Sequence, residues 1–165
     1  MKARRLPAEL TVKPVRNGLG IVALKPFREH AVICEIKGRI VSTATVWRYW
    51  DSEARLAENC FRYSAERYLN PEGEIGQYAN HSCDPNAGII KQDRRLWLKA
   101  IADIAPGDEV THDYSTLLGV DDVWKMRCNC GAARCRRWVR HIGTLPAAVA
   151  RRYHALGVIP AFVQT

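Results

Sequence analysis

Residues 77–86 read Gln-Tyr-Ala-Asn-His-Ser-Cys-Asp-Pro-Asn, and the rest of the chain is best interpreted from this stretch. It brings amide, imidazole, hydroxyl, thiol and carboxylate groups together around a proline. Asparagine, aspartate and serine side chains bond to nearby backbone, so the stretch favours turns over a helix or a regular strand. It is either a polar surface loop or a functional loop, since loops often carry binding and catalytic groups. Two later segments favour the functional loop.

The first of these segments is residues 107–114, Gly-Asp-Glu-Val-Thr-His-Asp-Tyr, and the second is residues 128–135, Cys-Asn-Cys-Gly-Ala-Ala-Arg-Cys. The second segment supplies three thiols, Cys128, Cys130 and Cys135, in a C-x-C-x4-C pattern. A structural zinc ion takes four ligands in a tetrahedron, commonly sulfur atoms. A fourth ligand must therefore come from elsewhere in the chain.

The candidates for that fourth ligand are Cys34, Cys60, Cys83 and the histidines. Cys34 lies in an apolar strand pattern and Cys60 lies beside Phe61, so both are interpreted as small core residues. Cys83 lies on the polar stretch, and we favour it. One zinc ion would then tie residue 83 to residues 128–135, and folding would depend on metal. The alternatives are three free cysteines, or a zinc knuckle for nucleic acid, which leaves the polar stretch unexplained.

Length and charge limit the function classes. A chain of 165 residues suits one domain with a core that needs no disulfides. The net charge of +8 favours an anionic partner such as nucleic acid or an acidic protein face. The alternative is a generically basic protein, since no basic run of the usual length is present. Neither a secretory signal nor a run of about 18 apolar residues is visible, so we expect an intracellular protein without a membrane span. Six cysteines in a reducing compartment indicate metal binding or chemistry.

The hydrophobic pattern predicts a mostly β fold of short strands with few short helices. A tight turn is expected at Asn17-Gly18. A helix is expected over residues 46–57, and its stripe of Trp47, Trp50, Ala54 and Ala57 is assigned to core packing. A C-terminal helix is expected with Val149, Tyr153 and Leu156 on one face.

The motifs at residues 80–86, 107–114 and 128–135, in this order, resemble the SET-domain protein lysine methyltransferases. The chain is similar to a compact stand-alone member with a post-SET zinc segment. Residues 18–20 resemble the family's first motif, and residues 35–38 its weaker second motif. The resemblance divides the chain into an N-terminal extension (1–11), a SET domain (12–117), a post-SET zinc segment (118–140) and a C-terminal helical tail (141–165).

The resemblance implies small β sheets with a pseudoknot that brings Asn80 and His81 next to Tyr114. It implies a site for the cosubstrate S-adenosylmethionine, with the contacts at Gly18, Leu19, Gly20, Asn80, His81, Tyr114 and Trp138. It also implies that Cys83 joins Cys128, Cys130 and Cys135 on a structural Zn²⁺.

The implied activity is methyl transfer to a lysine side chain of a protein, histone or DNA-associated, with nucleic acid as a further partner through the basic surface. Lysine has a pKa of about 10.4, and a buried channel beside a sulfonium cation disfavours its charged form. Tyr114 is the predicted catalytic residue, and it would orient the amine or help to polarise the methyl group, because a phenol of pKa about 10 is a poor base at neutral pH. The alternative is a non-catalytic zinc module that binds nucleic acid or a partner protein.

The sequence departs from the family pattern in four places, at Ile36, Gln77-Tyr78, His112 and Arg137. His112 stands where an aromatic side chain often influences the number of methyl groups added, and Arg137 stands where glycine is common. Tyr63 and Tyr68 are both candidates for the second channel tyrosine. Acidic residues such as Glu66, Glu72 and Glu74 are expected to line the substrate groove.

Overall fold

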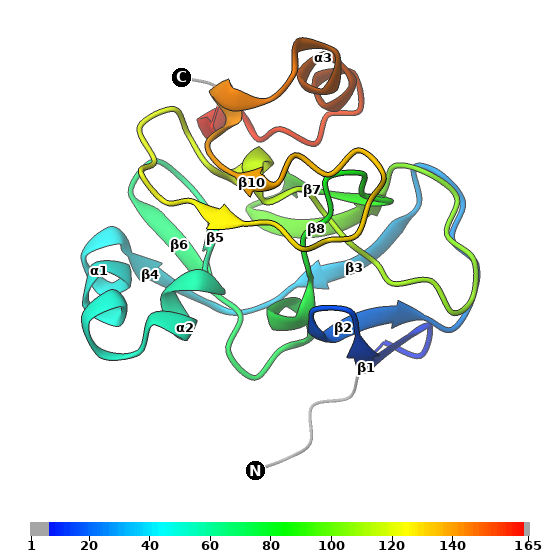
Figure 1. Ribbon diagram of the computed structural model, residues 1–165. Helices are drawn as coiled ribbons and strands as arrows, with labels where there is room; N and C mark the ends of the chain where they lie inside the picture. The colour runs from blue at the N-terminus through cyan, green and yellow to red at the C-terminus, as the bar shows by residue number, and fades with distance from the viewer. Residues whose placement is uncertain (1–6, 164–165) are drawn as a thin grey trace.

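The computed structural model describes residues 7–163, so residues 1–6 of the predicted extension and the last two of the predicted tail lie outside it. The strands are β1 (Leu10–Val15), β2 (Gly18–Ala23), β3 (Val32–Ile36), β4 (Arg39–Ser42), β5 (Phe61–Arg62), β6 (Arg67–Asn70), β7 (Ala87–Gln92), β8 (Arg95–Ala100), β9 (Met126–Arg127) and β10 (Trp138–Val139). The helices are α1 (Thr43–Ser52), α2 (Ala54–Glu58) and α3 (Ala147–Ala155), with 3₁₀ turns η1 (Ile75–Tyr78), η2 (Tyr114–Leu117), η3 (Ile142–Thr144) and η4 (Ala161–Val163). Figure 1 shows these elements as small antiparallel sheets around one centre, which confirms the mostly β prediction.

The central sheet has the order β3-β8-β7 and is antiparallel throughout. Leu96, Leu98 and Ala100 alternate along β8, and each is fully buried. This period of two is what places one face of a strand in the core. The main hydrophobic cluster forms on that face and also takes in Ile21 of β2 and Val110.

The β1–β2 hairpin confirms the predicted turn. Val15 pairs with Gly18 across a two-residue loop, and Gly18 has a φ of 92°, which glycine adopts without strain. Residues 18–20 lie on β2 next to the polar stretch, because Asn80 bonds to the Leu19 carbonyl. β2 also lies next to the segment 107–114, because Val22 bridges to Glu109.

The third sheet, β4-β6-β5, carries α1 and α2 on one side (Figure 1). The single helix predicted over residues 46–57 is wrong, because the chain breaks at Glu53, whose φ and ψ are −154° and 74°. Val46 and Ala57 are buried as expected for core residues. Trp47 is 58% exposed, so its assignment to the core is also wrong.

The C-terminal helix α3 is present where it was predicted. Tyr153 is buried to 1% exposure, and Val149 and Leu156 pack against the same small cluster. Gly157, with a φ of 68°, ends the helix. This cluster rests on the central sheet at Gly88, where an added Cβ would lie 2.5 Å from Val158.

The polar stretch and the segment 107–114 run side by side. His81 and His112 form a parallel bridge, the Ser82 N–H donates to the His112 carbonyl at 3.0 Å, and the His112 N–H donates to the Asn80 carbonyl at 3.0 Å. The Asn86 amide bonds to the backbone of Glu109 and Thr111. This is the contact that the predicted pseudoknot requires, and it makes the stretch an ordered part of the core. Among the described residues, no helix is long and apolar enough to cross a bilayer.

Candidate active site

Asn80 links the first motif to the segment 107–114. Its side-chain N–H groups donate to the Leu19 carbonyl at 3.0 Å and to Glu109 Oε1 at 2.8 Å. An added Cβ at Gly20 would lie 2.5 Å from that Glu109 oxygen and 3.0 Å from Asn80 Nδ2. Glycine at position 20 is therefore what allows Asn80 to reach β2.

His81 and Tyr114 meet as the sequence predicts. The Tyr114 N–H donates to His81 Nδ1 at 3.2 Å, and the ring centroids are 5.3 Å apart. The Tyr114 hydroxyl donates to the Ala79 carbonyl at 3.1 Å. Burial, with smaller contributions from Glu109 and Glu58, raises the pKa of Tyr114, so the phenol keeps its proton at neutral pH.

His112 lies behind Tyr114 and is 1% exposed. Its ring packs 4.9 Å from the Tyr114 ring and 5.7 Å from the Phe61 ring, so it fills an aromatic position. Burial, and the neighbouring His81, lower the pKa of His112 to about 3. The side chain is thus neutral at pH 7, and neither ring nitrogen makes a hydrogen bond within the described residues.

Two cavities meet at Tyr114. One, of about 250 Å³, is walled mainly by apolar and aromatic side chains, among them Trp47, Trp50, Phe61, Tyr68 and His112. The other, of about 270 Å³, is lined by more polar groups, among them Asn17, Asn80, His81, Arg127 and Asn129. Glu58, Asn59, Tyr114 and Trp124 line both. We call the first the aromatic cavity and the second the polar cavity.

The linings of the two cavities show where several residues predicted from the sequence lie. Tyr68 lines the aromatic cavity, whereas the Tyr63 hydroxyl donates to the Arg94 carbonyl at 2.8 Å and Tyr63 is not part of the described lining. The acidic groups in that lining are Glu58, Asp121 and Asp122, in place of the expected glutamates at positions 66, 72 and 74.

Trp138 does not line either cavity as described. Its indole lies between two guanidinium groups, 5.8 Å from that of Arg127 and 5.5 Å from that of Arg140. Its cofactor contact stays a prediction, as do those of residues 18–20. Trp124, Glu58 and Asn59 were not predicted, because no local motif marks them and only the fold carries them to Tyr114.

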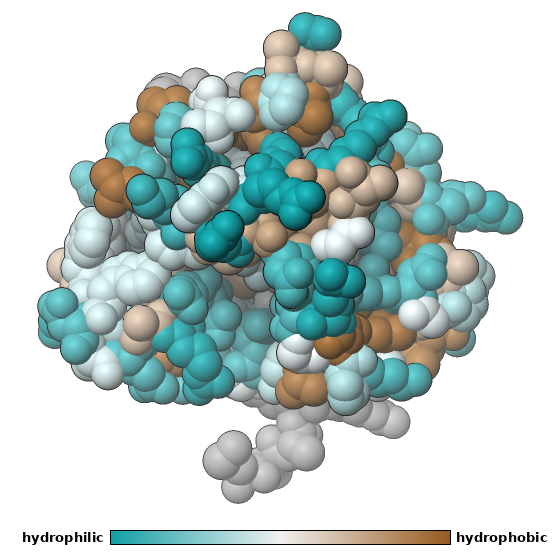
Figure 2. Space-filling model, viewed as in Figure 1, coloured by the Kyte–Doolittle hydropathy of each residue, from teal (hydrophilic) through white to brown (hydrophobic). Residues whose placement is uncertain are grey.

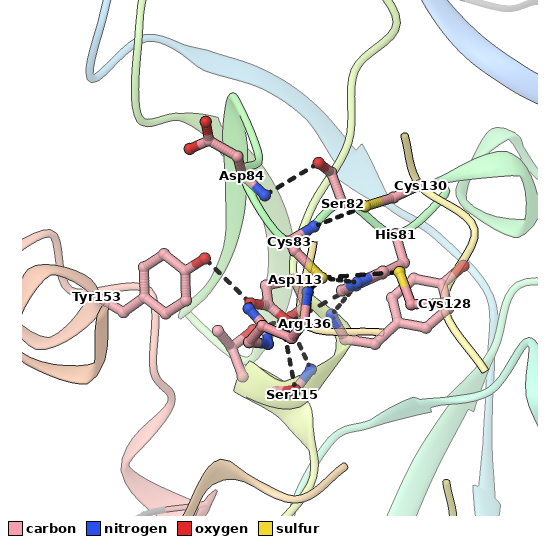
Figure 3. Close-up of polar contacts among 12 residues, drawn as sticks. His81, Ser82, Cys83, Asp84, Asp113, Ser115, Cys128, Cys130, Arg136 and Tyr153 are labelled. Carbon is pink, nitrogen blue, oxygen red and sulfur yellow. Dashed lines mark hydrogen bonds and ion pairs between the residues drawn. The ribbon is translucent and has the colours of Figure 1, made fainter. Parts of the chain in front are cut away.

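Three of the four predicted zinc ligands, Cys83, Cys128 and Cys130, come together, with His81 as the fourth member of the group (Figure 3). Cys135 is not a member of this group, so its place on the metal stays a prediction. The sulfur atoms of Cys83, Cys128 and Cys130 and one His81 ring nitrogen all lie within 4.8 Å of one another. Cys83 Sγ lies 3.7 Å from Cys128 Sγ, and Cys135 Sγ lies 4.0 Å from the Cys128 carbonyl. Cys34 is buried in the main core, and the Cys60 thiol donates to the Leu56 carbonyl.

The donor set suits a tetrahedral zinc ion. Backbone N–H groups point at the sulfur atoms of Cys130, Cys83 and Cys135 from 3.4 to 3.5 Å, an arrangement that favours thiolates. Burial raises the pKa of Cys83 to about 11 and also raises that of Cys128. Burial alone would raise the pKa of Cys130 too, but backbone donors and the neighbouring thiols lower it to about 7. Metal would therefore bind with release of protons from the cluster.

A family model described as SET domain matches residues 18–115. The chain belongs to the SET domain family. The match lies inside the 12–117 that the resemblance implies, and all of the domain boundaries stay predictions. The recognition of the family from three short motifs is confirmed.

Relatives of this SET domain are named histone methyltransferases. "Histone-lysine N-methyltransferase trr" of Drosophila melanogaster is 31% identical over 132 residues, which cover 74% of this chain and 5% of that protein. "Histone-lysine N-methyltransferase Set2" of Drosophila melanogaster is 40% identical over 133 residues, which cover 75% of this chain and 6% of that protein. The chain thus spans only a small fraction of the length of these relatives.

A solved structure shares the fold. It is titled as KRYPTONITE in complex with mCHH DNA, an H3(1-15) peptide and SAH, and it matches with a TM-score of 0.62 at 26% identity. The match covers 83% of this SET-domain chain and 30% of that chain. It therefore extends beyond residues 18–115 and confirms the SET-type architecture.

Proposed function

We propose that this SET domain transfers a methyl group from S-adenosylmethionine to a lysine side chain of a protein. The observation that carries the proposal is the meeting of the two cavities at Tyr114. A transfer between two bound molecules needs two sites that open onto one point. The names of the relatives and the SAH-bound structure support the same reaction class.

The polar cavity fits the cosubstrate by its chemistry. Side-chain amides of Asn17, Asn80 and Asn129 offer donors and acceptors for a nucleoside and an amino acid, and Trp124 and Tyr114 offer aromatic surface. When bound, S-adenosylmethionine supplies an electrophilic methyl group on a positively charged sulfur.

The aromatic cavity fits a lysine side chain. Its aromatic walls would contact the methylene groups and disfavour the ammonium form, because apolar surroundings remove the water that solvates the charge. Glu58, Asp121 and Asp122 provide negative charge along the same lining. Arg62 offsets part of it, since its Nη1 lies 2.7 Å from Asp122 Oδ2 and 3.3 Å from Asp121 Oδ1. A cationic substrate segment is thus attracted locally, although the whole chain is basic.

Tyr114 would act by orientation. Its hydroxyl stays protonated, is held by the Ala79 carbonyl, and leaves oxygen lone pairs at the meeting point of the cavities. These lone pairs would accept an N–H group of a neutral amine and align it with the sulfur–methyl bond, and positioning can supply much of a rate enhancement.

The first experiment is calorimetric titration of the zinc-loaded protein with the demethylated product, followed by methyl transfer to a library of lysine-containing proteins. We expect micromolar binding, about −8 kcal/mol. Tyr114→Phe should lower the rate of transfer far more than the affinity for the product. Tyr63→Phe is the matched control, because its hydroxyl bonds to Arg94 outside the described cavities. No binding by folded, zinc-replete protein would remove the proposal.

A second partner, nucleic acid, is favoured by where the charge lies. Residues 123–165 carry eight lysines and arginines and no aspartate or glutamate, while residues 1–122 carry seventeen of each sign. The whole net charge of +8 therefore belongs to the last 43 residues. Figure 2 shows strongly hydrophilic side chains gathered over the middle of the face where β10 lies in Figure 1. We propose that this surface contacts nucleic-acid phosphates.

This partner has its own test. Arg134→Gln with Arg140→Gln removes two exposed charges from the basic segment, and Arg48→Gln with Arg55→Gln removes two from α1 and α2. Each lost phosphate contact should reduce the slope of log K against log salt by about 1. We expect a reduction of about 2 for the first pair and none for the second. Equal effects of the two pairs on the salt slope would refute a localised nucleic-acid-binding surface.

An intracellular location stays a prediction.

A further inference from the structure

Asp113, the residue before Tyr114, carries a carboxylate that is fully buried (Figure 3). Both of its oxygens are bonded. Arg136 Nη1 donates to Oδ2 and Nη2 donates to Oδ1, each at 2.7 Å. The Tyr153 hydroxyl donates to Oδ2 at 3.0 Å, and the Ser115 N–H donates to Oδ1 at 3.0 Å. Such a charge is stable inside a protein only with partners of this quality.

The partners come from segments far apart in the sequence. Arg136 directly follows Cys135, the last thiol of the C-x-C-x4-C pattern, and Tyr153 belongs to α3. The carboxylate thus joins the cysteine segment and the C-terminal helix to the backbone of η2, on which Tyr114 stands.

The network also reaches the polar stretch. His81 Nδ1 lies 3.6 Å from Asp113 Oδ1 and accepts the Tyr114 N–H at 3.2 Å. Arg136 Nη2 further donates to Ser115 Oγ at 3.3 Å, so the guanidinium spans Asp113 and Ser115, the residues on either side of Tyr114. A bidentate guanidinium fixes direction as well as distance, which an ammonium group cannot do.

We propose that Arg136 is a positioning residue for the reaction and holds Tyr114 in place through Asp113. Because Arg136 directly follows Cys135, the site would be competent only when the cysteine segment is folded. Tyr153 is the second clamp on the same carboxylate, so α3 takes part in shaping the site from outside the region 18–115 that the family model matches. The kinetic part of this inference rests on the proposed methyl transfer. The structural part does not.

The test compares Arg136→Lys with Arg28→Lys in the zinc-loaded chain of 165 residues. Arg136→Lys keeps the charge beside Asp113 and loses the bidentate geometry. Arg28 bonds to Asp103 at 2.8 Å on the exposed surface, so its lysine variant is the matched control for an arginine–aspartate pair. Tyr153→Phe removes one hydrogen bond to Asp113 without touching the cysteine segment, and it keeps the inference testable if Arg136→Lys folds poorly.

We expect Arg136→Lys to lower kcat about tenfold or more, with KM and the affinity for the demethylated product nearly unchanged, because misplacement of a reacting group acts on the rate. Tyr153→Phe should lower kcat in the same way by a smaller factor. Arg28→Lys should leave kcat, KM and the affinity for the demethylated product unchanged.

Hydrogen exchange of the Tyr114 and Ser115 amides is the readout that needs no activity, since these N–H groups donate within the network. Arg136→Lys should speed their exchange about tenfold or more and leave the amides of β7 and β8 unchanged. If wild type transfers no methyl group, the proposed function fails while the exchange result still decides the positioning role. Unchanged exchange at both amides, or equal loss of protection throughout β7 and β8, would overturn the inference.

Discussion

Lowering the pH should destabilise the protein through His112, and the size of the effect follows from its burial. The pKa of His112 is about 3 in the folded state and returns to its ordinary 6.5 on unfolding. Above pH 6.5 both states are neutral and there is no penalty. As the pH falls below 6.5 the unfolded state takes up a proton that the folded state refuses, so stability is lost down to the folded pKa. Between pH 7 and pH 5 this amounts to about 2 kcal/mol.

The measurement is urea unfolding of wild type and His112→Phe at pH 5, 6 and 7 in one zinc-containing buffer. Phenylalanine keeps the aromatic contacts with Phe61 and Tyr114 and does not titrate. The acid sensitivity of the thiol cluster is common to both proteins, so the difference between their pH dependences isolates position 112. We expect wild type to lose about 2 kcal/mol more than the variant between pH 7 and pH 5. Parallel pH dependences would refute the buried, neutral histidine, whatever the offset between the two curves.

Three further changes test other parts of the structure. Arg137 has a left-handed φ of 68° and an exposed side chain, so Arg137→Gly should raise the unfolding free energy by about 0.5–1 kcal/mol, while Arg137→Ala, which keeps the Cβ, should not. Equal urea midpoints for the two variants would contradict the backbone explanation. Gly20→Ala would place a Cβ 2.5 Å from Glu109 Oε1 and so break the Asn80 contact, which should weaken calorimetric binding of the demethylated product about tenfold or more. Lys13→Ala, at the exposed residue that pairs with Gly20 across the hairpin, should have little effect. Cys83→Ser should lower the zinc content and loosen residues 128–135, and full zinc content in Cys83→Ser with loss in Cys60→Ser would identify a different fourth ligand.

The sequence predicted those features of the fold and of the site that depend on residues close together in the chain. The turn at Asn17-Gly18 and the C-terminal helix are properties of a few consecutive residues, and the structure contains both. Two thiols of the cysteine pattern, Cys128 and Cys130, lie beside Cys83 as predicted. Arg137 shows that a departure from the family pattern has a physical reading, because the glycine common at that position suits the left-handed φ that arginine adopts here.

The rest depends on contacts between distant segments. Trp124 lines the cavities beside Tyr114 because the chain after η2 returns to Arg62 of β5, which bonds to Asp121 and Asp122, and no spacing in the sequence records that. Trp138 was placed by resemblance, but its side chain lies between Arg127 and Arg140 on a two-residue strand. The helix over residues 46–57 failed for a related reason, since periodicity marks an apolar face but does not show where tertiary packing interrupts it.

The two histidine rings packed against Tyr114 and the Tyr114 phenol itself share one property that the proposed reaction requires. Burial lowers the pKa of His81 to about 4 and that of His112 to about 3, and it raises that of Tyr114, so all three are neutral at pH 7. The buried cation nearest to them, Arg136, is neutralised by a bidentate bond to Asp113. Methyl transfer to lysine brings a sulfonium and an amine derived from an ammonium to one point, and a protonated histidine there would repel both. Uncharged histidine rings therefore favour the approach of the two reactants, and their neutral state follows mainly from burial. The carboxylates of Glu58, Asp121 and Asp122 in the cavity lining attract a cationic reactant and do not repel it.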